Sequence, residues 1–339
     1  TGSSAAANPS SGGASSGGMC PLNPSGNPAG GMCASDPAST PGGQPSAAVG
    51  NPINVMSGNK FQQETDMTAL PGVLGLQLSR SYNSQSQARG VLGVGWRHAY
   101  EVSLQESPAH IQILQADGRR LIFPRQANGV CASVHPGDGQ VEKTAHGWRW
   151  QWTGGRVLEF EPRPGDARHG RLAAIRDPAQ PGMPSLSLRY GLRGELVSVR
   201  DPVGHSLHFH YGFHGAARWP EVRVDTPAGR YRYRLDGEGR LLTVQQADGA
   251  WLGYYYEPQR QGGDPNNLTG RAEWQAGARV WRRTATWAYD GMDRAVLSEH
   301  ADGVERVSLR FVTAPAARSG ADGEFETVLT NSLGQSTRY

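Results

Sequence analysis

"GRYRYRLDGEGRLLTVQQADG", residues 229–249, contains two strand-like runs and two kinds of turn. The first run carries the aromatic Tyr233 near its end. A Gly-Arg turn, Gly239-Arg240, leads into a second run, and Asp248-Gly249 closes the stretch. Glycine supplies the positive φ that tight antiparallel connections need. The stretch therefore predicts one structural unit: strand, Gly turn, strand, Asp-Gly turn.

The same unit recurs along the C-terminal half of the chain. Strand-ending aromatics recur at spacings of 21, 22, 22, 34 and 22, at Tyr190, Tyr211, Tyr233, Tyr255, Tyr289 and Phe311. The long interval contains a loop insertion at 258–267, and another at 314–324 precedes Tyr339. Two strands of ~6 residues plus two turns account for a period near 22. The repeats predict about seven units over residues 166–339.

A single two-stranded hairpin is barely stable, so consecutive units are expected to pair edge to edge in one twisted sheet. The predicted fold is all-β, a continuous antiparallel meander of β-hairpin repeats forming a curved, open sheet. A β-propeller is the alternative, because two units supply the four strands of one blade. The Gly-His and Trp-Asp signatures of the commonest propellers are missing, which favours the open sheet.

Residues 49–165 are also rich in strand signals. The stretch "LGLQLSRSY" (74–82) alternates leucines with the period of a half-buried strand. The turns Ala116-Asp117-Gly118 and Gly154-Gly155 each separate two strand-like runs. No ten-residue stretch of the chain shows a 3.6-residue period. This region, residues 49–165, is predicted to be β-rich.

Residues 1–48 differ in composition from the rest of the chain. Ser, Gly, Ala and Pro dominate them, and Asp36 is their one charged residue. Such a segment cannot bury enough apolar surface to offset its ordering entropy, so a disordered linker is predicted. Cys20 and Cys33 within it lack the companions of a zinc site and are interpreted as loop cysteines. Cys131 is expected to be a lone thiol near a turn.

The charge pattern and the chain start bear on partners and localisation. The net charge is +3, and arginines are spread singly and not gathered in a basic stripe, so no nucleic-acid partner is predicted. No run approaches the ~18 apolar residues of a membrane span. No signal peptide is visible, and the start at Thr1 suggests a piece of a longer chain.

No catalytic, cofactor-binding or metal-binding residue is predicted. His208 and His210 share a strand face, but no carboxylate or cysteine accompanies them locally. The sequence "GASSG" (13–17) fits the nucleophile-elbow pattern but lies in the linker, without the strand-turn-helix context. Neither Lys60 nor Lys143 belongs to a phosphate-binding loop.

Trp148, Trp150 and Trp152 fall on one face of a single predicted strand. An exposed stripe of this kind stacks sugars or presents a partner surface, whereas a buried stripe faces the inside of a curved sheet. The buried arrangement is the one expected.

The repeats resemble Rhs/YD repeats, a name that refers to the Tyr-Asp pair seen here as Tyr289-Asp290. The Gly-Arg turn, the Asp-x-x-Gly turn and the aromatic strand end match that pattern. The opening stretch "GNPINVMSGNKFQQETD" (50–66), with "GVLGVGWRHAYEVSL" (90–104), resembles the head domain that precedes the repeats in bacterial Rhs proteins.

The resemblance implies a non-catalytic segment of an Rhs-type toxin. Its strands would form the first part of a hollow β-shell around a C-terminal toxin that is absent from this chain. The implied partners are the rest of the same polypeptide, including the toxin, and secretion-spike or chaperone proteins. The implied localisation is extracellular, or inside a target cell after delivery through type VI machinery. The alternative is a carbohydrate- or receptor-binding surface protein built from the same repeats.

Overall fold

The computed structural model describes residues 48–71, 75–133, 136–152, 155–177, 182, 186–258, 263–313 and 325–339. The predicted linker up to residue 47, with Cys20 and Cys33, lies outside them, as do Gly154 and the loop 314–324. The described residues form strands and two short 3-10 helices, η1 (Pro136–Asp138) and η2 (Ala301–Gly303), with no α-helix. The all-β prediction is confirmed.

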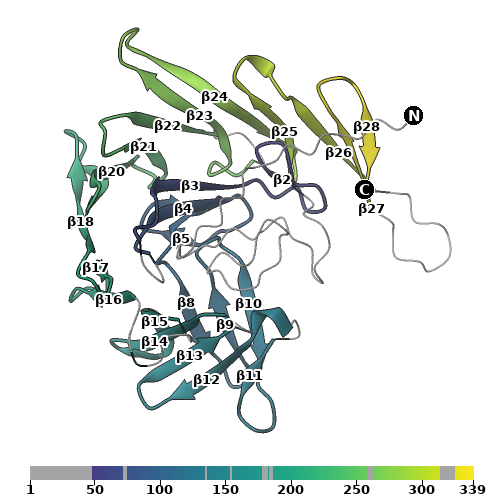
Figure 1. Ribbon diagram of the computed structural model, residues 1–339. Helices are drawn as coiled ribbons and strands as arrows, with labels where there is room; N and C mark the ends of the chain where they lie inside the picture. The colour runs from purple at the N-terminus through teal and green to yellow at the C-terminus, as the bar shows by residue number, and fades with distance from the viewer. Residues whose placement is uncertain are drawn as a thin grey trace, which may run out of the picture.

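Residues 48–71 and 75–102, here called the inner segment, contain seven short strands. These are β1 (Ala48–Val49), β2 (Ile53–Asn54), β3 (Phe61–Met67), β4 (Leu78–Asn83), β5 (Arg89–Gly90), β6 (Gly93–Val94) and β7 (Trp96–His98). β3, β4 and β7 form a three-stranded antiparallel sheet. Every residue of β4 is buried, because this small sheet is covered on both faces: Figure 1 shows it inside the curve of the later strands.

The next eight strands form a closed ring. They are β8 (Ser103–Glu106), β9 (His110–Leu114), β10 (Arg120–Pro124), β11 (Cys131–Ala132), β12 (Gln140–Thr144), β13 (Gly147–Gln151), β14 (Val157–Arg163) and β15 (Asp166–Arg176). Each pairs with the next, and β8 also pairs with β15, Leu104 opposite Gly170. The meander predicted from the repeats is thus preceded by strands that close on themselves.

Strand β15 is shared between the ring and the sheet that follows it. Along one edge it pairs with β14 over nearly its whole length. The other edge is divided: residues 169–171 pair with β8, and Ala174 and Ile175 pair with β16. β8 and β16 therefore diverge from a common strand.

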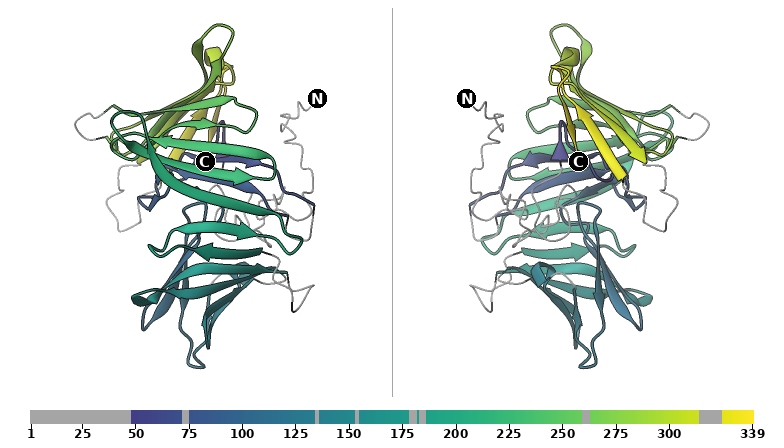
Figure 2. Two further views of the ribbon diagram at one scale, coloured as in Figure 1. Left: turned by 90° about the vertical axis from the view of Figure 1, so that its left-hand side faces the viewer. Right: turned by 90° about the vertical axis from the view of Figure 1, so that its right-hand side faces the viewer.

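The remaining strands, here called the open sheet, run from β16 to β28. They are β16 (Leu186–Tyr190), β17 (Leu196–Arg200), β18 (Ser206–His214), β19 (Trp219–Thr226), β20 (Gly229–Leu235), β21 (Leu241–Gln245), β22 (Trp251–Tyr256), β23 (Leu268–Gln275), β24 (Val280–Tyr289), β25 (Ala295–His300), β26 (Val307–Thr313), β27 (Phe325–Thr330) and β28 (Ser336–Arg338). Each pairs antiparallel with its neighbour in sequence. Figure 2 shows them as one twisted, curved sheet rather than as separate blades, so the propeller alternative is wrong.

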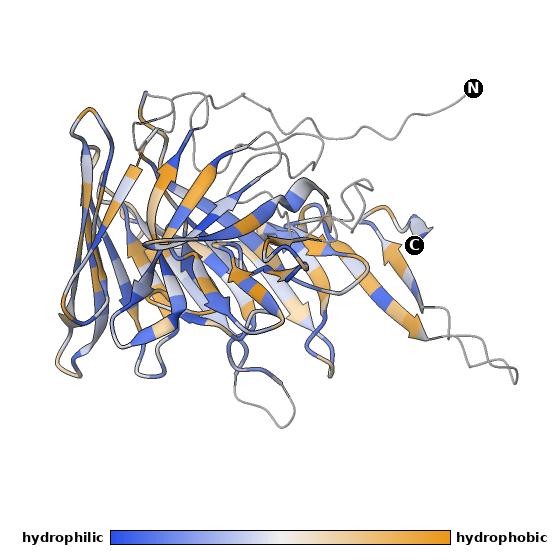
Figure 3. Cartoon of the chain, turned by 90° about the horizontal axis from the view of Figure 1, so that it is seen from below, coloured by the Kyte–Doolittle hydropathy of each residue, from blue (hydrophilic) through white to orange (hydrophobic). Residues whose placement is uncertain are grey.

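Apolar and polar residues alternate along these strands (Figure 3). In β19, Val222 and Val224 are buried between less buried neighbours, and Tyr231 and Tyr233 repeat the pattern in β20. Alternation of this kind places one face of a sheet against a core and leaves the other polar. The core-facing side is the concave side, which holds the inner segment.

The turns between strands reuse one arrangement of side chains. The Asp290 Oδ1 accepts the backbone N–H of Arg294, and Oδ2 accepts its guanidinium at 2.7 Å. Asp236 does the same for Arg240. The backbone takes positive φ at Gly239 and at Asp293, the third residue after each of these aspartates. The Asp and the Gly-Arg of the repeat are thus parts of one turn.

A tyrosine hydroxyl fastens four of the strand pairs. In each case the hydroxyl donates to the carbonyl of the leucine that begins the preceding strand or lies within it, at 2.6–3.0 Å: Tyr190 to Leu172, Tyr211 to Leu196, Tyr256 to Leu241 and Tyr289 to Leu268. In the fourth unit this residue is Tyr256, one position after the Tyr255 expected from the spacing. In the unit of Tyr233, the residue at the position equivalent to Tyr256 is Leu235: it pairs with Leu241 just after a register shift, as Tyr256 pairs with Leu268. A leucine has no hydroxyl, so this unit lacks the bond.

None of the described residues belongs to a helix that is long and apolar enough to cross a membrane.

Candidate functional site: the interface between the inner segment and the open sheet

The histidines noted in the sequence lie on or beside β18 and have separate partners. These are the Asp201 carboxylate for His205, the Ser206 hydroxyl for His208, the Asp225 carboxylate for His210 and the Leu235 carbonyl for His214. Within the described ranges, no three metal-ligating side chains gather in one place. The geometry does not bring these histidines together as a ligand set.

The tryptophan stripe of Trp148, Trp150 and Trp152 is buried, as expected. All three side chains are at most 2% exposed, and they belong to the ring rather than to the open sheet. The Trp150 ring lies 5.9 Å from that of Phe123 and 4.8 Å from that of Trp152. These residues therefore form a core and offer no sugar-stacking surface. Cys131 is a buried free thiol in the same ring.

The centre of the interface is a buried ion pair between Arg80 and Asp66 of the inner segment. The Arg80 Nε lies 3.0 Å from the Asp66 Oδ2, and both side chains are 1% exposed. Tyr231 and Tyr233 of β20 donate their hydroxyls to the Asp66 carbonyl and carboxylate. Burial, together with the charge of Asp66, raises the pKa of Tyr233 well above its usual value, so this hydroxyl stays protonated as a donor.

Aromatic rings surround the arginine. The Arg80 guanidinium carbon lies 5.0 Å from the centre of the Trp96 ring and 5.2 Å from that of Tyr254 in β22. Such contacts favour a desolvated cation. Because Trp96 belongs to the inner segment and Tyr254 to the open sheet, the arginine holds the two together.

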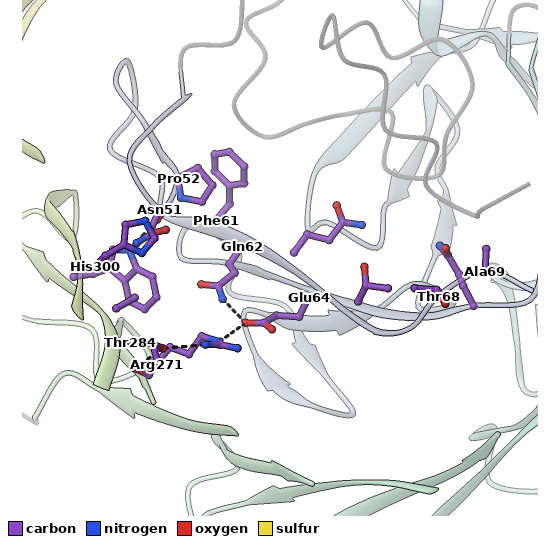
Figure 4. A pocket seen from close by; sticks show the side chains of 15 residues that line it. Asn51, Pro52, Phe61, Gln62, Glu64, Thr68, Ala69, Arg271, Thr284 and His300 are labelled. Atoms are coloured by element: carbon purple, nitrogen blue, oxygen red, sulfur yellow. Dashed lines mark hydrogen bonds and ion pairs between the residues drawn. The ribbon is translucent and has the colours of Figure 1, made fainter. Parts of the chain in front are cut away.

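Glu64 of β3 makes a second ionic contact with the open sheet. Its Oε1 lies 3.1 Å from the Nε of Arg271 in β23, and Gln62 donates to the same carboxylate oxygen (Figure 4). Arg271 also donates to the Thr284 hydroxyl. These residues line a cavity of about 750 Å³ between β3 and strands β23 to β25.

Lys60 is fully buried at one end of β3. Its Nζ donates to the carbonyls of Asn51 and Phe61 at 2.7 and 2.8 Å, and it lies 4.1 Å from the centre of the Trp287 ring. Burial lowers the pKa of Lys60 well below its ordinary value, although Glu64 opposes the shift. The side chain thus ties the first turns of the inner segment to β24.

Further bonds join the two parts along the sheet. The Tyr82 hydroxyl donates to the Asn266 carbonyl and accepts the backbone N–H of Leu268. The Trp96 indole donates to the Tyr256 hydroxyl at 3.0 Å. The Ala295 N–H donates to the Gly58 carbonyl. The interface therefore extends from β20 to β25.

This arrangement supports a mechanical role. Most of its carboxylates, guanidinium groups and hydroxyls are paired with one another across the interface, which holds two parts of the chain in fixed register. Among the described residues, the Arg80 Nη1 and the Tyr254 hydroxyl are buried without a hydrogen-bond partner. This interface was not predicted from the sequence. The available signal was Arg80 between Ser79 and Ser81 in a strand otherwise read as half-buried, because a charge inside such a strand needs a buried partner.

Part of the chain matches a known protein family. Residues 50–123 match the family described as "Domain of unknown function (DUF6531)". The match covers β2 to β10, that is, the inner segment and the start of the ring.

Several curated proteins are similar in sequence. The chain is 24% identical over 310 residues to the probable deoxyribonuclease RhsA of Dickeya dadantii, covering 86% of this chain and 19% of that protein. It is 26% identical over 363 residues to the toxin protein Tse5 of Pseudomonas aeruginosa (86% and 27%). It is 26% identical over 207 residues to the double-stranded DNA deaminase toxin A of Burkholderia cenocepacia (59% and 14%). The chain spans less than a third of the length of each of these relatives.

Among solved structures, the chain resembles one titled "Crystal Structure of TcdB2-TccC3-Cdc42". The TM-score is 0.33 at 11% identity, over 77% of this chain and 14% of that chain. A TM-score of this size is too low to establish a shared fold.

Proposed function

The chain is an Rhs/YD-repeat protein, and we propose that it forms the first part of a hollow β-shell that encloses a C-terminal toxin. In this proposal, residues 1–48 are a linker, residues 49–165 are the head domain, and residues 166–339 are the repeats. The toxin itself is not among these residues. The relatives named as toxins support the assignment to a toxin-related segment.

The observation that carries the proposal is the continuous curved sheet β16 to β28 with its inner segment. Hairpins add one beside another without a break, and the concave side carries the buried face. In the described part of the chain β28 pairs only with β27, so further hairpins have a free edge to join. A wall built this way separates an interior from solvent.

The proposed role is non-catalytic. The names of the relatives refer to DNA cleavage and DNA deamination, and we assign such activities to regions outside this chain. The 339 residues alone should therefore neither cut nor deaminate plasmid or oligonucleotide DNA. Measurable turnover of either kind by this chain would overturn the proposal.

Confinement is tested in the full-length parent polypeptide. Limited trypsin digestion should leave the enclosed toxin region intact while the same region, expressed separately, is cut. Arg80→Met should loosen the inner segment from the sheet and expose the toxin region to trypsin. Arg149→Met removes an arginine from an exposed ion pair with Glu142 on the ring and is the matched control. Equal digestion of the toxin region inside and outside the parent chain would contradict confinement.

The proposal also covers localisation and partners. A toxin-related segment of this kind acts outside the producing cell or inside a target cell after delivery, and the similarity to a protein named as a toxin supports this localisation. Type VI secretion is the delivery route that we propose. Secretion-spike or chaperone proteins are the proposed external partners. The carbohydrate alternative loses the surface that suggested it, since Trp148, Trp150 and Trp152 are buried.

A further inference from the structure

The hairpin of β23 and β24 projects beyond the strands on either side of it. β22 pairs with β23 only as far as Glu273, and β25 pairs with β24 only from Ala285. In the described part of the chain, residues 274–283 therefore pair only with one another, out to Gln275 opposite Val280. Figures 1 and 2 both show this green hairpin at the top of the molecule, past the neighbouring turns. Residues 274–283 are called the β23–β24 tip below.

The β23–β24 tip presents apolar side chains at its outer end. The turn Ala276-Gly277-Ala278-Arg279 is exposed, and Val280 and Trp281 after it are 52% and 37% exposed. Trp274 lies directly opposite Trp281, and the two rings meet edge to face at 5.4 Å. Trp281 also lies over the backbone of Gly253, where an added Cβ would be 3.0 Å from the indole. This packing holds the two indoles in a fixed position.

The β23–β24 tip is also positively charged. It contains Arg279, Arg282 and Arg283 and no acidic residue. The Arg283 guanidinium carbon lies 4.7 Å from the centre of the Tyr255 ring, and among the described residues neither Arg279 nor Arg283 has an ion-pair partner. Arg282 lies 3.5 Å from Asp302, but both side chains are more than half exposed, so water screens this pair. The arginines are therefore available to a negatively charged partner.

The order of residues along the tip matches the layers of a membrane surface. Tryptophan is enriched at the boundary between lipid headgroups and hydrocarbon, and arginine binds phosphate oxygens. Trp281 and Arg283 are two residues apart, roughly 7 Å along a strand, and one headgroup layer is roughly 5–8 Å thick. With Val280 and Trp281 at the hydrocarbon boundary, Arg283 would lie among the phosphates. Glu273, the acidic residue next to the tip, is held by Arg271 at 2.9 Å.

Other partners fit the β23–β24 tip less well. A stable protein interface uses about 20–30 residues a side, and this short projection offers far fewer. Nucleic-acid bases stack on open ring faces, whereas the indoles of Trp274 and Trp281 pack on each other and on Gly253. A second copy of the chain would bring arginines against arginines. The combination of apolar end and basic flank favours an anionic lipid surface.

We propose that the β23–β24 tip docks the protein on an anionic lipid surface. The apolar end enters the headgroup boundary, and the arginines bind lipid phosphates. Because few apolar side chains take part, this docking is shallow and reversible. Each arginine near such a surface strengthens binding about fivefold, and salt weakens the attraction. The docking does not depend on the proposed confinement, which concerns the concave side of the open sheet.

Co-sedimentation of the 339-residue chain with lipid vesicles tests the docking. At low salt the chain should bind vesicles of equal parts phosphatidylglycerol and phosphatidylcholine, and it should not bind phosphatidylcholine alone. Arg282→Gln combined with Arg283→Gln should weaken binding roughly twentyfold. The matched control combines Arg149→Gln with Arg230→Gln. It removes the same charge from exposed ion pairs elsewhere and should leave binding largely unchanged.

A pair of tryptophan variants tests the apolar contact. Trp281→Ala should weaken vesicle binding about tenfold, as expected when a large apolar side chain loses partial burial. Trp219→Ala is the matched control, because Trp219 is 39% exposed and follows the turn between β18 and β19, on the opposite edge of the open sheet. This variant should bind like the wild type. Thermal unfolding of each variant shows whether it is folded.

Vesicle binding that depends on both the two arginines and Trp281 supports the proposal. No binding to anionic vesicles at low salt would overturn it, and so would an equal loss in either matched control. A single-stranded DNA oligonucleotide and a polyglutamate peptide probe the other partners. Saturable binding of one of these through Arg282 and Arg283, with no vesicle binding, would assign the tip to that partner and overturn the lipid proposal.

Discussion

Asp290, the aspartate of the Tyr-Asp pair, accounts for the turn chemistry of the repeat. Its carboxylate accepts the Arg294 backbone N–H and guanidinium and also the backbone N–H of Met292. Burial opposes ionisation, but these hydrogen bonds outweigh it and lower the pKa of Asp290. The aspartate is therefore a structural cap, which explains why the repeat carries it without any catalytic partner.

Replacing this aspartate should destabilise the fold. Asp290→Ala should lower the free energy of unfolding by about 1–2 kcal/mol at pH 7, since charge-assisted bonds to the backbone and Arg294 are lost. Asp248→Ala is the matched control, because Asp248 caps one backbone N–H and binds no arginine. Urea denaturation measures both. Equal losses in the two variants would show that the arginine contact contributes nothing.

The same carboxylate gives a pH dependence of known sign. Because its pKa is lower in the folded than in the unfolded chain, its contribution is full above the unfolded value of about 4 and is lost as pH falls through the folded value. The stability difference between the wild type and Asp290→Ala should therefore shrink below about pH 4. A difference that stays constant down to pH 2 would contradict this assignment.

Lys60 and Lys143 are the two lysines of the chain and differ completely in environment. Lys60 is buried with a lowered pKa, whereas the Lys143 side chain is 59% exposed beside Glu106. Amine acylation of the folded protein at pH 8, read by peptide mass spectrometry, should label Lys143 and spare Lys60. Both should react in urea. Equal labelling in the folded state would show that the inner segment opens readily.

At the level of strands, the tyrosine hydroxyls act as cross-strand ties. Tyr289→Phe should cost about 1 kcal/mol of stability, the usual net worth of one buried hydrogen bond. Tyr255→Phe is the control, since Tyr255 is 40% exposed and makes no such bond to a leucine carbonyl. Denaturant midpoints compare them. A larger loss for Tyr255→Phe would reverse the assignment of the repeat position.

That assignment also shows where sequence periodicity stops being informative. The spacing of aromatics located every unit of the open sheet, because hairpins of this size repeat near 22 residues. The spacing predicted Tyr255 rather than Tyr256 as the aromatic residue of this repeat, because three consecutive tyrosines fit the period almost equally well. The choice is made by a register shift between Tyr255 and Tyr256, and a bulge of this kind leaves no clear mark in the spacing.

The turn between β12 and β13 depends on one glycine. Gly147 has φ +146°, and a Cβ there would lie 1.9 Å from the Phe160 carbonyl oxygen of β14. Gly147→Ala should therefore lower the melting temperature strongly. Gly165→Ala is the control. Gly165 has φ +80° and nothing lies within 4 Å of an added Cβ, so this substitution introduces backbone strain without a steric clash. Similar melting temperatures for the two variants would show that the backbone of the ring shifts to accommodate the added methyl group at residue 147.

At the scale of the whole molecule, the sequence predicted the all-β meander and the curved open sheet. The alternation of buried and exposed residues and the density of turns are local properties, so they can be read from the chain. The ring closure and the inner segment depend on contacts such as Leu104 with Gly170 and Asp66 with Tyr233. These pairs are far apart in sequence, and no local pattern specifies them.

Hydrogen exchange should show that the inner segment and the ring are more protected than the far end of the open sheet. Amides of β4, β8 and β15 should exchange slowest, because these strands are paired on both edges or buried on both faces. Amides of β28, an exposed strand with one partner, should exchange fastest among the strands. Mass spectrometry of peptic fragments measures this order. Uniform protection from β8 to β28 would indicate a single cooperative unit instead.

The division of the second edge of β15 between two neighbours has a consequence for how such proteins vary in length. One end of the open sheet is bonded to β15, so hairpins added beyond β28 would leave that end unchanged. Duplication of a repeat there would enlarge the open sheet without changing the pairing of β15 with β8 and β16.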